Sequence, residues 1–227
     1  MISNWPCPLS DGRTSDELLV THGTGGEKRI LIIPPLFGEH NAMRRQLIEV
    51  MRRLADSRIE TLLPDLPGWN ESVEPLQHQT LAHWRDAIRV IAQTLQVSAV
   101  LAVRSGALLV PAELSAWLYA PQPGEQVLRT MVRARIIASR EAGFEETSEA
   151  VCTEGRTTGV TLGGWQIGPE LFGELENADV AANPAHIIID QAMIGGPALW
   201  LRAEPDEDAA QADALATTIL EDMAVPG

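Results

Sequence analysis

The chain has 227 residues, of which 45% are apolar, so its length fits one domain with a sizeable core. Its 17 basic and 31 acidic side chains give a formal net charge of −14 at pH 7. This balance argues against a nucleic-acid or anionic-membrane partner, because phosphate binding needs a concentrated basic surface. No apolar run approaches the roughly 20 residues of a membrane-spanning helix, so no membrane span is expected.

The two ends of the chain and its cysteines bear on location. Residues Met1–Pro8 carry no basic segment followed by an apolar stretch, so we expect no secretory signal. Cys7 and Cys152 cannot form a disulfide framework, and we expect a cytoplasmic protein. No basic residue follows Arg202, so the last part of the chain is strongly acidic. We expect an acidic helix and tail over about residues 204–227.

Short apolar runs alternate with helical patterns, which predicts a mainly parallel sheet covered by helices on both faces. The elements expected in the first half are a strand over 29–34, a helix over 40–56, a strand over 59–64, a helix over 80–95 with Thr80 as its N-cap, and a strand over 98–103 that leads into a helix beginning near Leu108. Gly23–Gly26 is expected to be a hairpin turn, since no Gly-Lys-Ser/Thr follows it to make a phosphate loop.

The second half predicts an excursion from the sheet followed by two further strands. The elements expected there are a strand over 115–120, a helix over 125–141, a polar loop over 145–159, a bent strand pair over 160–167, a helix that starts at Gly168-Pro169, and strands over 186–190 and 198–202. We therefore expect a single domain over residues 1–227, with a cap-like excursion over about 121–180.

The turn after strand 98–103 carries the most specific local signal. In α/β-hydrolases the nucleophile occupies a tight strand-to-helix turn flanked by small residues, because the backbone there is strained and closely packed. Residues 102–106 fit this frame with alanine and glycine at its small positions, so Arg104 is expected at the apex and Ser105 one place later. A shifted frame with Ser105 at the apex would put Val103 at a small position. The element order and this turn predict an α/β-hydrolase-like fold with a reduced cap.

A serine hydrolase of this fold also needs a histidine after its last strand. The only histidine after Ser105 is His186, which opens a predicted strand, and Asp190 at the end of that strand is a candidate acid. His40, in the loop after the first buried strand, either faces the pocket as an improvised base or simply starts the helix. No complete triad can be assembled, so Ser105 and His40 are the candidate catalytic residues of an active-hydrolase alternative.

Metal and cofactor chemistry has no support in the sequence. The five histidines show no short paired spacing, and neither cysteine has a second cysteine nearby. We expect no metal and no cofactor.

Arg104 also supports a pocket that binds a ligand without catalysis. Near Glu39, Asn41 and Asp65, its guanidinium could pair with a carboxylate or phosphate of a small anionic ligand. Alternatively, it forms an internal ion pair with Glu39 that pins the loop. Two tryptophans in turn-rich segments are candidate pocket walls, with core packing equally open: Trp69 and Trp165.

Several segments carry a resemblance to a known family: Pro34–Arg45, Leu63–Gly68, Trp84–Asp86, Val103–Ala107, Trp117–Arg135 and Gly163–Leu171. Together they resemble the exosortase A system-associated hydrolase 2 family over about residues 30–202. The resemblance implies an α/β-hydrolase fold, a place in gene clusters for exopolysaccharide production and protein sorting, and an arginine at the elbow apex. The chain departs from the family pattern with Ser105, where leucine is usual, and with His40, where methionine is frequent.

Two functions stay open. The first is a binding protein that lacks a complete triad and holds a small anionic or acylated molecule at the elbow, with Arg104, Glu39 and Asn41 among its binding residues. The second is an active serine hydrolase, an acyl esterase with Ser105 as nucleophile and His40 as base.

Overall fold

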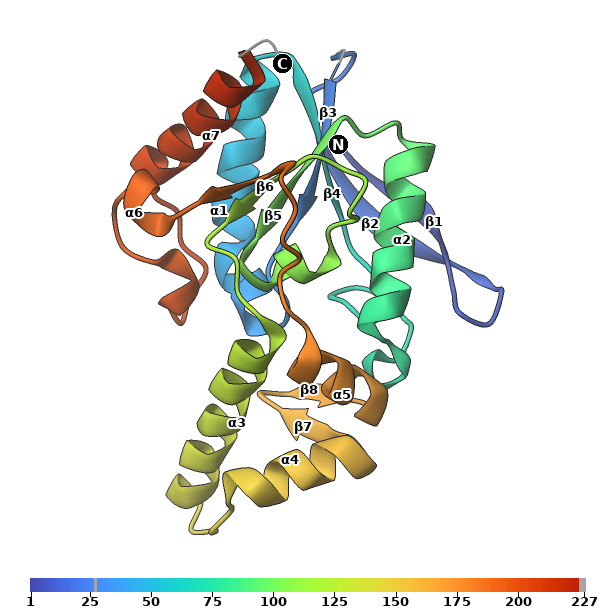
Figure 1. The fold of residues 1–227 in the computed structure, drawn as a ribbon, viewed down its shortest axis with the longest axis vertical. Coiled ribbons are helices and arrows are strands. Elements are labelled where there is room, and N and C mark those ends of the chain that lie inside the picture. The colour runs from blue at the N-terminus through green and yellow to red at the C-terminus, as the bar shows by residue number, and fades with distance from the viewer. Residues whose placement is uncertain (27, 225–227) are drawn as a thin grey trace.

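A seven-stranded sheet forms the centre of the computed structural model, which describes residues 1–26 and 28–224. The strand order is β1-β2-β4-β3-β5-β6-β9, and β3, β4, β5, β6 and β9 are parallel to one another (Figure 1). The carboxyl ends of these strands meet at one edge, where open α/β sheets bind ligands. The strands are β1 Ile2–Pro8, β2 Thr14–His22, β3 Lys28–Ile33, β4 Ile59–Pro64, β5 Ala99–Val103, β6 Ala116–Tyr119 and β9 His186–Ile189.

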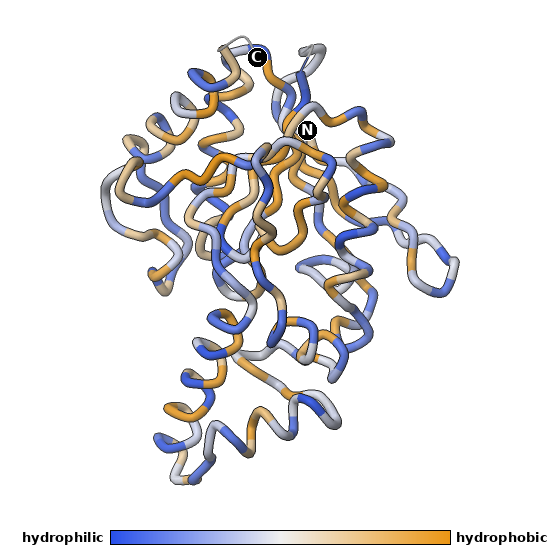
Figure 2. The backbone as a smooth tube through the Cα atoms, in the orientation of Figure 1, coloured by the Kyte–Doolittle hydropathy of each residue, from blue (hydrophilic) through white to orange (hydrophobic). Residues whose placement is uncertain are grey.

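Helices cover both faces of the sheet because its parallel strands are apolar on both sides. Alternate side chains of β3 point to opposite faces: Ile30 and Ile32 belong to one buried cluster, and the two neighbouring side chains, Leu31 and Ile33, belong to the other. Figure 2 shows the apolar strands at the centre, between helices with hydrophilic outer sides. The covering helices are α1 (Gly38–Asp56) and α7 (Ala209–Ala224) on one face and α2 (Leu81–Thr94) on the other.

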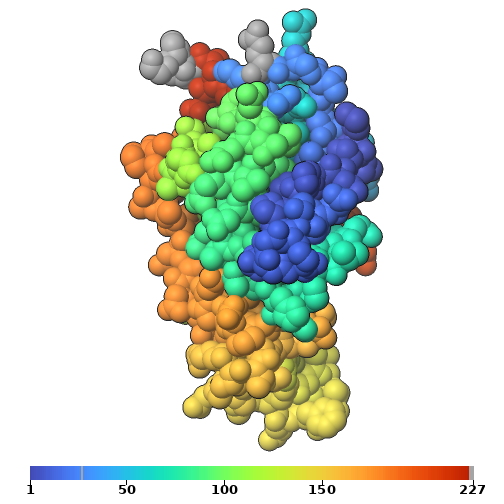
Figure 3. Space-filling view, turned by 90° about the vertical axis from the view of Figure 1, so that its right-hand side faces the viewer, coloured from blue at the N-terminus to red at the C-terminus, as the bar shows by residue number. Residues whose placement is uncertain are grey.

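The chain leaves the sheet after β6 and returns to it at β9, and the segment between them builds a cap-like layer beyond the carboxyl edge. In Figures 1 and 3 this yellow and orange segment forms the lower end of the molecule. Its elements are α3 Gly124–Glu141, α4 Ser148–Thr157, the antiparallel hairpin of β7 Val160–Leu162 and β8 Trp165–Ile167, and α5 Pro169–Asn177.

Most of the expected elements are confirmed. The strands predicted over 29–34, 59–64, 98–103, 115–120 and 186–190, the helices over 40–56, 80–95 and 125–141, and the strand pair over 160–167 all match observed elements to within about two residues. Thr80 caps α2, since its hydroxyl accepts the backbone N–H of His83 at 3.0 Å. Pro169 stands in the first turn of α5, where its missing N–H costs nothing.

The helix expected to begin near Leu108 is wrong. After β5 the chain forms only a short 3₁₀ helix, η2 (Arg104–Leu109), and then becomes extended at Val110. Pro111 explains this, because proline biases the residue before it away from helical geometry and cannot donate its own backbone hydrogen bond. The turn typical of the fold is therefore present after β5, but a short 3₁₀ helix follows it in place of an α-helix.

Three other expectations are corrected. The polar segment 145–159 is not a loop but contains α4, which Thr147 caps and which packs on α5. Residues 198–202 form a 3₁₀ helix (η3, Leu199–Leu201) in place of a strand. Gly23–Gly26 is not a hairpin turn, since β2 pairs with β4 rather than with β3. The hairpin prediction failed because the partner of β2 is distant in sequence, which the local pattern does not reveal.

The two chain ends complete the architecture. β1 and β2 form an antiparallel pair at one edge of the sheet. Near the other terminus, α7 packs against α1 on one face of the sheet. The expected acidic helix is observed as α7, while residues 225–227 of the expected tail lie outside the described residues. Within the described ranges, no helix combines the length and apolar character that a bilayer crossing requires.

The cap on α2 gives a direct stability prediction. Thr80→Ala removes the acceptor for the His83 N–H, so the free energy of unfolding should fall by about 1 kcal/mol. Thr80→Ser keeps a hydroxyl and should retain most of that stability. Urea unfolding of the three proteins checks this expectation, and an equal loss in the serine variant would contradict it.

Candidate functional site

The turn after β5 has the backbone geometry of an elbow, and its apex is Arg104. Arg104 has a left-handed φ of 54°, a conformation that non-glycine residues rarely adopt. Two residues later, a Cβ on Gly106 would lie 2.5 Å from both the Ile33 and the Pro34 carbonyl oxygens, so only glycine fits there. The structure thus places the arginine at the apex, as the spacing of small residues predicts.

Each guanidinium nitrogen of Arg104 donates a hydrogen bond to a group of the protein. Its Nε and Nη2 donate to the two carboxylate oxygens of Glu39 at 3.0 and 3.3 Å, and Nη1 donates to the Ala120 carbonyl at 3.1 Å. Its guanidinium carbon also lies 4.4 Å from the ring centroid of Trp200. The internal ion pair with Glu39 is therefore present, and the arginine side chain is only 12% exposed.

Ser105 lies beneath the loop that follows β3. The residue is 1% exposed, and its hydroxyl oxygen accepts the backbone N–H of Leu36 at 2.9 Å. This bond links the elbow to the loop in which an α/β-hydrolase carries part of its oxyanion hole. Within the described part of the chain, no histidine hydrogen-bonds to Ser105.

His40 lies in a separate buried group, away from Ser105. Its Nε2 is 3.3 Å from Nη1 of Arg44 and 3.5 Å from Nδ2 of Asn70, and its ring packs edge-on against Trp69 with centroids 5.5 Å apart. Burial, and to a smaller extent the charge of Arg44, lower the pKa of His40 to about 3. The imidazole is therefore neutral at pH 7, and the structure does not bring it to the elbow.

Asp65 and Trp69 belong to the same group, which we call the His40 cluster (His40, Arg44, Asp65, Trp69 and Asn70). Oδ1 of Asp65 accepts from Asn70 at 2.7 Å and lies 3.5 Å from Arg44. Burial raises the pKa of the Asp65 carboxyl above its usual range. Trp69 also packs edge-on against Trp84 at 5.3 Å, which is the core alternative for this tryptophan. Neither Asp65 nor Trp69 lines the cavity next to the elbow, which is described below.

The last histidine and its neighbouring acid also lie elsewhere. His186 begins β9 at the edge of the sheet, with Nε2 3.3 Å from Nδ2 of Asn183. Asp190 follows the same strand and precedes the short helix α6 (Gln191–Ile194). Neither of them is among the residues that line the cavity at the elbow.

A cavity of about 780 Å³ opens between the elbow and the cap-like layer, and we call it the elbow pocket. The first turn of α1 contributes Glu39 and Asn41, and Ser105 is also a lining residue. Arg104 contacts two of the lining residues, Glu39 and Trp200. Apolar side chains make most of the remaining surface, as in small-molecule sites generally. They are Leu36, Phe37, Ala42, Val127, Met131, Ala134, Trp165, Trp200, Leu201, Ala203 and Pro205.

One polar residue of the pocket was missed from the sequence. Gln122 is 3% exposed and lines the elbow pocket, yet among the described residues its Oε1 has no hydrogen-bond partner. A buried amide oxygen without a partner costs free energy, so it marks a place where a bound donor would be favourable. Its position just after β6, at the carboxyl edge of the sheet, was the available signal.

Metal binding has no corresponding arrangement. In the part of the chain that the structure describes, no three histidine, cysteine, aspartate or glutamate side chains come together in a way that could hold an ion.

Comparison with known proteins identifies the fold. No family model matches the sequence, and no curated protein matches it. Among solved structures, Rv0554 from Mycobacterium tuberculosis aligns over 100% of both chains at 12% identity with a TM-score of 0.55. A bromoperoxidase from Bacillus anthracis aligns over 98% of this chain and 100% of its own, at 12% identity and TM-score 0.53.

Two further matches differ in how much of each chain they cover. Est1E from Butyrivibrio proteoclasticus, solved with ferulic acid bound, aligns over 92% of this chain and 97% of its own, at 12% identity and TM-score 0.54. An epoxide hydrolase from Vigna radiata matches over 52% of this chain but only 39% of its own length, at 14% identity and TM-score 0.39. The sheet, its covering helices and the full-length matches show that the chain has an α/β-hydrolase fold.

The buried His40 makes stability depend on pH with a defined sign. As pH falls, the unfolded chain takes up a proton near pH 6.5, whereas the folded chain does so only near pH 3, so the free energy of unfolding should fall with pH in this window. The slope contributed is at most about 1.4 kcal/mol per pH unit. Urea unfolding between pH 7 and pH 4 should show a shallower slope for His40→Gln than for the unmodified chain, and equal slopes would disprove this origin.

Arg104 and Glu39 should make a coupled contribution to the free energy of unfolding, because both side chains are mostly buried. A double-mutant cycle with Arg104→Met and Glu39→Gln should give a coupling energy of about 1–3 kcal/mol in unfolding measurements. The matched control is the exposed pair of Arg45 and Glu207, which has similar two-bond geometry and should couple by less than about 1 kcal/mol. Equal coupling in the two cycles would contradict the expectation.

Proposed function

We propose that this protein is a binding protein built on the α/β-hydrolase fold, which holds one small acylated molecule in the elbow pocket without hydrolysing it. The observation that carries this proposal is the residue at the elbow apex. Where the fold presents its nucleophile, this chain has Arg104, and the guanidinium is held by Glu39 and the Ala120 carbonyl.

The surroundings of Ser105 support the absence of a serine mechanism. A nucleophilic serine needs a base within hydrogen-bond reach, and here the hydroxyl instead accepts a backbone N–H from Leu36. The candidate base, His40, is bound within its own cluster by Arg44 and Asn70. Its lowered pKa also makes it a weak proton acceptor.

The chemistry of the pocket favours an acylated ligand over an anionic one. Three of the five guanidinium N–H groups of Arg104 already donate to the protein, and Glu39 balances its charge, so an anion there would compete with that carboxylate. The apolar walls suit an acyl chain, and the unpartnered Oε1 of Gln122 suits a hydroxyl or amide N–H donor on the same ligand. A fatty-acyl ester of a sugar combines both features.

The biological setting belongs to the same proposal. The resemblance of the loop 34–45 and of the elbow 103–107 to the exosortase A system-associated hydrolase 2 family supports a role beside exopolysaccharide production and protein sorting. The free thiols of Cys7 and Cys152 support a cytoplasmic location.

The alternative function is an active serine hydrolase. It is favoured by one observation, that Ser105 lines the elbow pocket within one residue of the apex. For this function the Leu36 N–H bond to the serine would have to be exchanged for a contact with a base when substrate binds.

Binding of octanoyl glucose tests the proposal. Calorimetry should detect binding to the unmodified protein without release of octanoate. Gln122→Leu should weaken binding by about tenfold, because the ligand donor loses its acceptor. Gln126→Leu, an exposed position on α3 outside the elbow pocket, is the matched control and should bind as the unmodified protein does.

Turnover of p-nitrophenyl butyrate separates the two functions. The binding proposal expects no turnover above that of the buffer. Turnover by the unmodified protein that Ser105→Ala abolishes would establish the alternative, whereas equal rates in both proteins would exclude Ser105 from any mechanism.

A further inference from the structure

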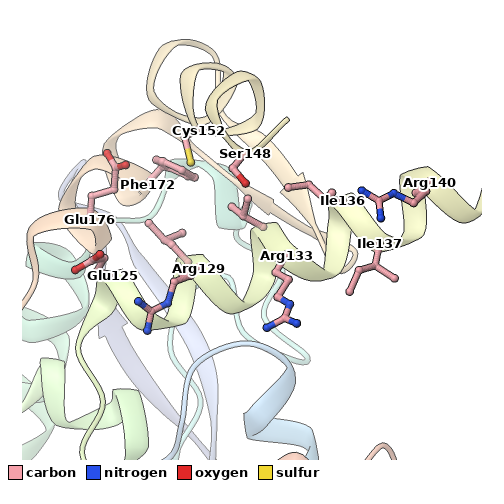
Figure 4. A pocket seen from close by; sticks show the side chains of 12 residues that line it. Glu125, Arg129, Arg133, Ile136, Ile137, Arg140, Ser148, Cys152, Phe172 and Glu176 are labelled. Atoms are coloured by element: carbon pink, nitrogen blue, oxygen red, sulfur yellow. The ribbon is translucent and has the colours of Figure 1, made fainter. Parts of the chain in front are cut away.

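The cap-like layer contains a second cavity, which is separate from the elbow pocket. It has a volume of about 630 Å³ and lies between α3, α4 and α5, and we call it the cap groove. Figure 4 shows Phe172 and Cys152 on one side and α3 along the other. Its apolar surface comes mainly from Leu128, Val132, Ile136 and Phe172.

Helix α3 separates the two cavities. Val127 and Met131 face the elbow pocket, whereas Leu128 and Val132, each one position further along the helix, line the cap groove. Successive helical residues point about 100° apart, so one helix can supply walls to both cavities. The cap groove is therefore independent of the residues on which the proposed function depends.

Three arginines of α3 line the cap groove. Most arginines in this acidic chain form ion pairs, but within the described residues Arg129, Arg133 and Arg140 form none. All three are exposed, and Figure 4 shows them in succession along the helix. Their neighbour Arg135, in contrast, is bound by Glu146 and Glu154.

The two carboxylates of the cap groove, Glu125 and Glu176, lie at the end away from Arg140. Glu176 is neutralised by Arg156, with Nη2 to Oε1 at 2.7 Å. Glu125 stands in the first turn of α3, and Figure 4 shows it at the opposite end of the groove from Arg140. Among the described residues, arginines of the groove without an ion pair therefore run along α3 from Arg129 to Arg140, and Arg133 and Arg140 lie toward the end opposite Glu125.

We propose that the cap groove binds a single-chain anionic amphiphile, an alkyl or acyl chain that ends in a phosphate-type head. The chain lies along Leu128, Val132 and Ile136 against Phe172, and the head pairs with Arg133 and Arg140. A groove walled by three helices suits one free molecule, whereas a membrane surface needs an open apolar face. The arginines of the groove favour an anionic head, because they concentrate positive charge in a chain whose net charge is −14.

Cys152 provides a reporter that is specific to this groove. It is partly exposed and lines the cap groove, whereas Cys7 is fully buried and burial raises the pKa of its thiol to about 12. A maleimide should therefore modify Cys152 and leave Cys7 intact, because the thiolate is the reacting species. A bound amphiphile should shield Cys152 and slow the reaction.

The first experiment measures this shielding with octyl phosphate below its micelle concentration. Octyl phosphate should slow modification of Cys152 in a saturable way, and decyl phosphate should do so at concentrations several-fold lower, because two more methylenes are buried. Octyl glucoside and inorganic phosphate should each need at least tenfold higher concentrations. Equal shielding by the glucoside, no shielding by any of them, or shielding only by vesicles of anionic phospholipid would overturn the proposal.

The second experiment uses charge variants with a matched control. Arg133→Gln should weaken shielding by octyl phosphate by about tenfold, and the added change Arg140→Gln should weaken it further. Arg58→Gln removes an exposed arginine that also forms no ion pair in the described structure but lies outside the groove, so shielding should be unchanged. Equal effects at positions 133 and 58 would show general charge attraction and overturn the site. Loss of octanoyl glucose binding would leave this readout unaffected, so the two proposals fail separately.

Discussion

The ion pair between Arg104 and Glu39 joins two segments on which the elbow pocket depends, the turn after β5 and the loop after β3 with the first turn of α1. Two further contacts hold the same segments together: Ser105 accepts the Leu36 N–H, and Gly106 packs directly against the carbonyls at the end of β3. Because these contacts are mutually close, the elbow and the loop behave as one unit. In this structure, the Arg104 guanidinium and the Ser105 hydroxyl both hydrogen-bond to groups of the protein.

The cap-like layer turns one helix into the wall of two different cavities. The side of α3 that faces the sheet helps to close a largely apolar cavity, in which the charge of Arg104 is balanced by Glu39. The adjoining side carries Arg129 and Arg133, which no carboxylate in the described structure neutralises. The two proposals therefore assign different ligand chemistry to the two cavities, acylated and uncharged in one case and anionic in the other.

Much of the sheet was predictable because its strands are short apolar runs bounded by turn-forming residues. Residues 59–64 and 98–103 read as buried strands without reference to any partner, and the helix between them shows its own apolar stripe. The elements that were misjudged lack such internal signals. α4 is a largely exposed helix that packs on α5, and Trp200, in the 3₁₀ helix η3, packs over Arg104 from a distant part of the chain.

The sequence by itself determined which residue lies at the apex of the elbow, because the small residues that the turn requires lie two positions before and after it in the chain. It could not determine where the neighbouring side chains point. Glu39 and His40 are adjacent at the start of α1, and since successive helical residues diverge by about 100°, the first meets Arg104 while the second enters a separate cluster with Asn70. Only the packing of α1 against the sheet decided that division, since the local sequence is the same for both residues.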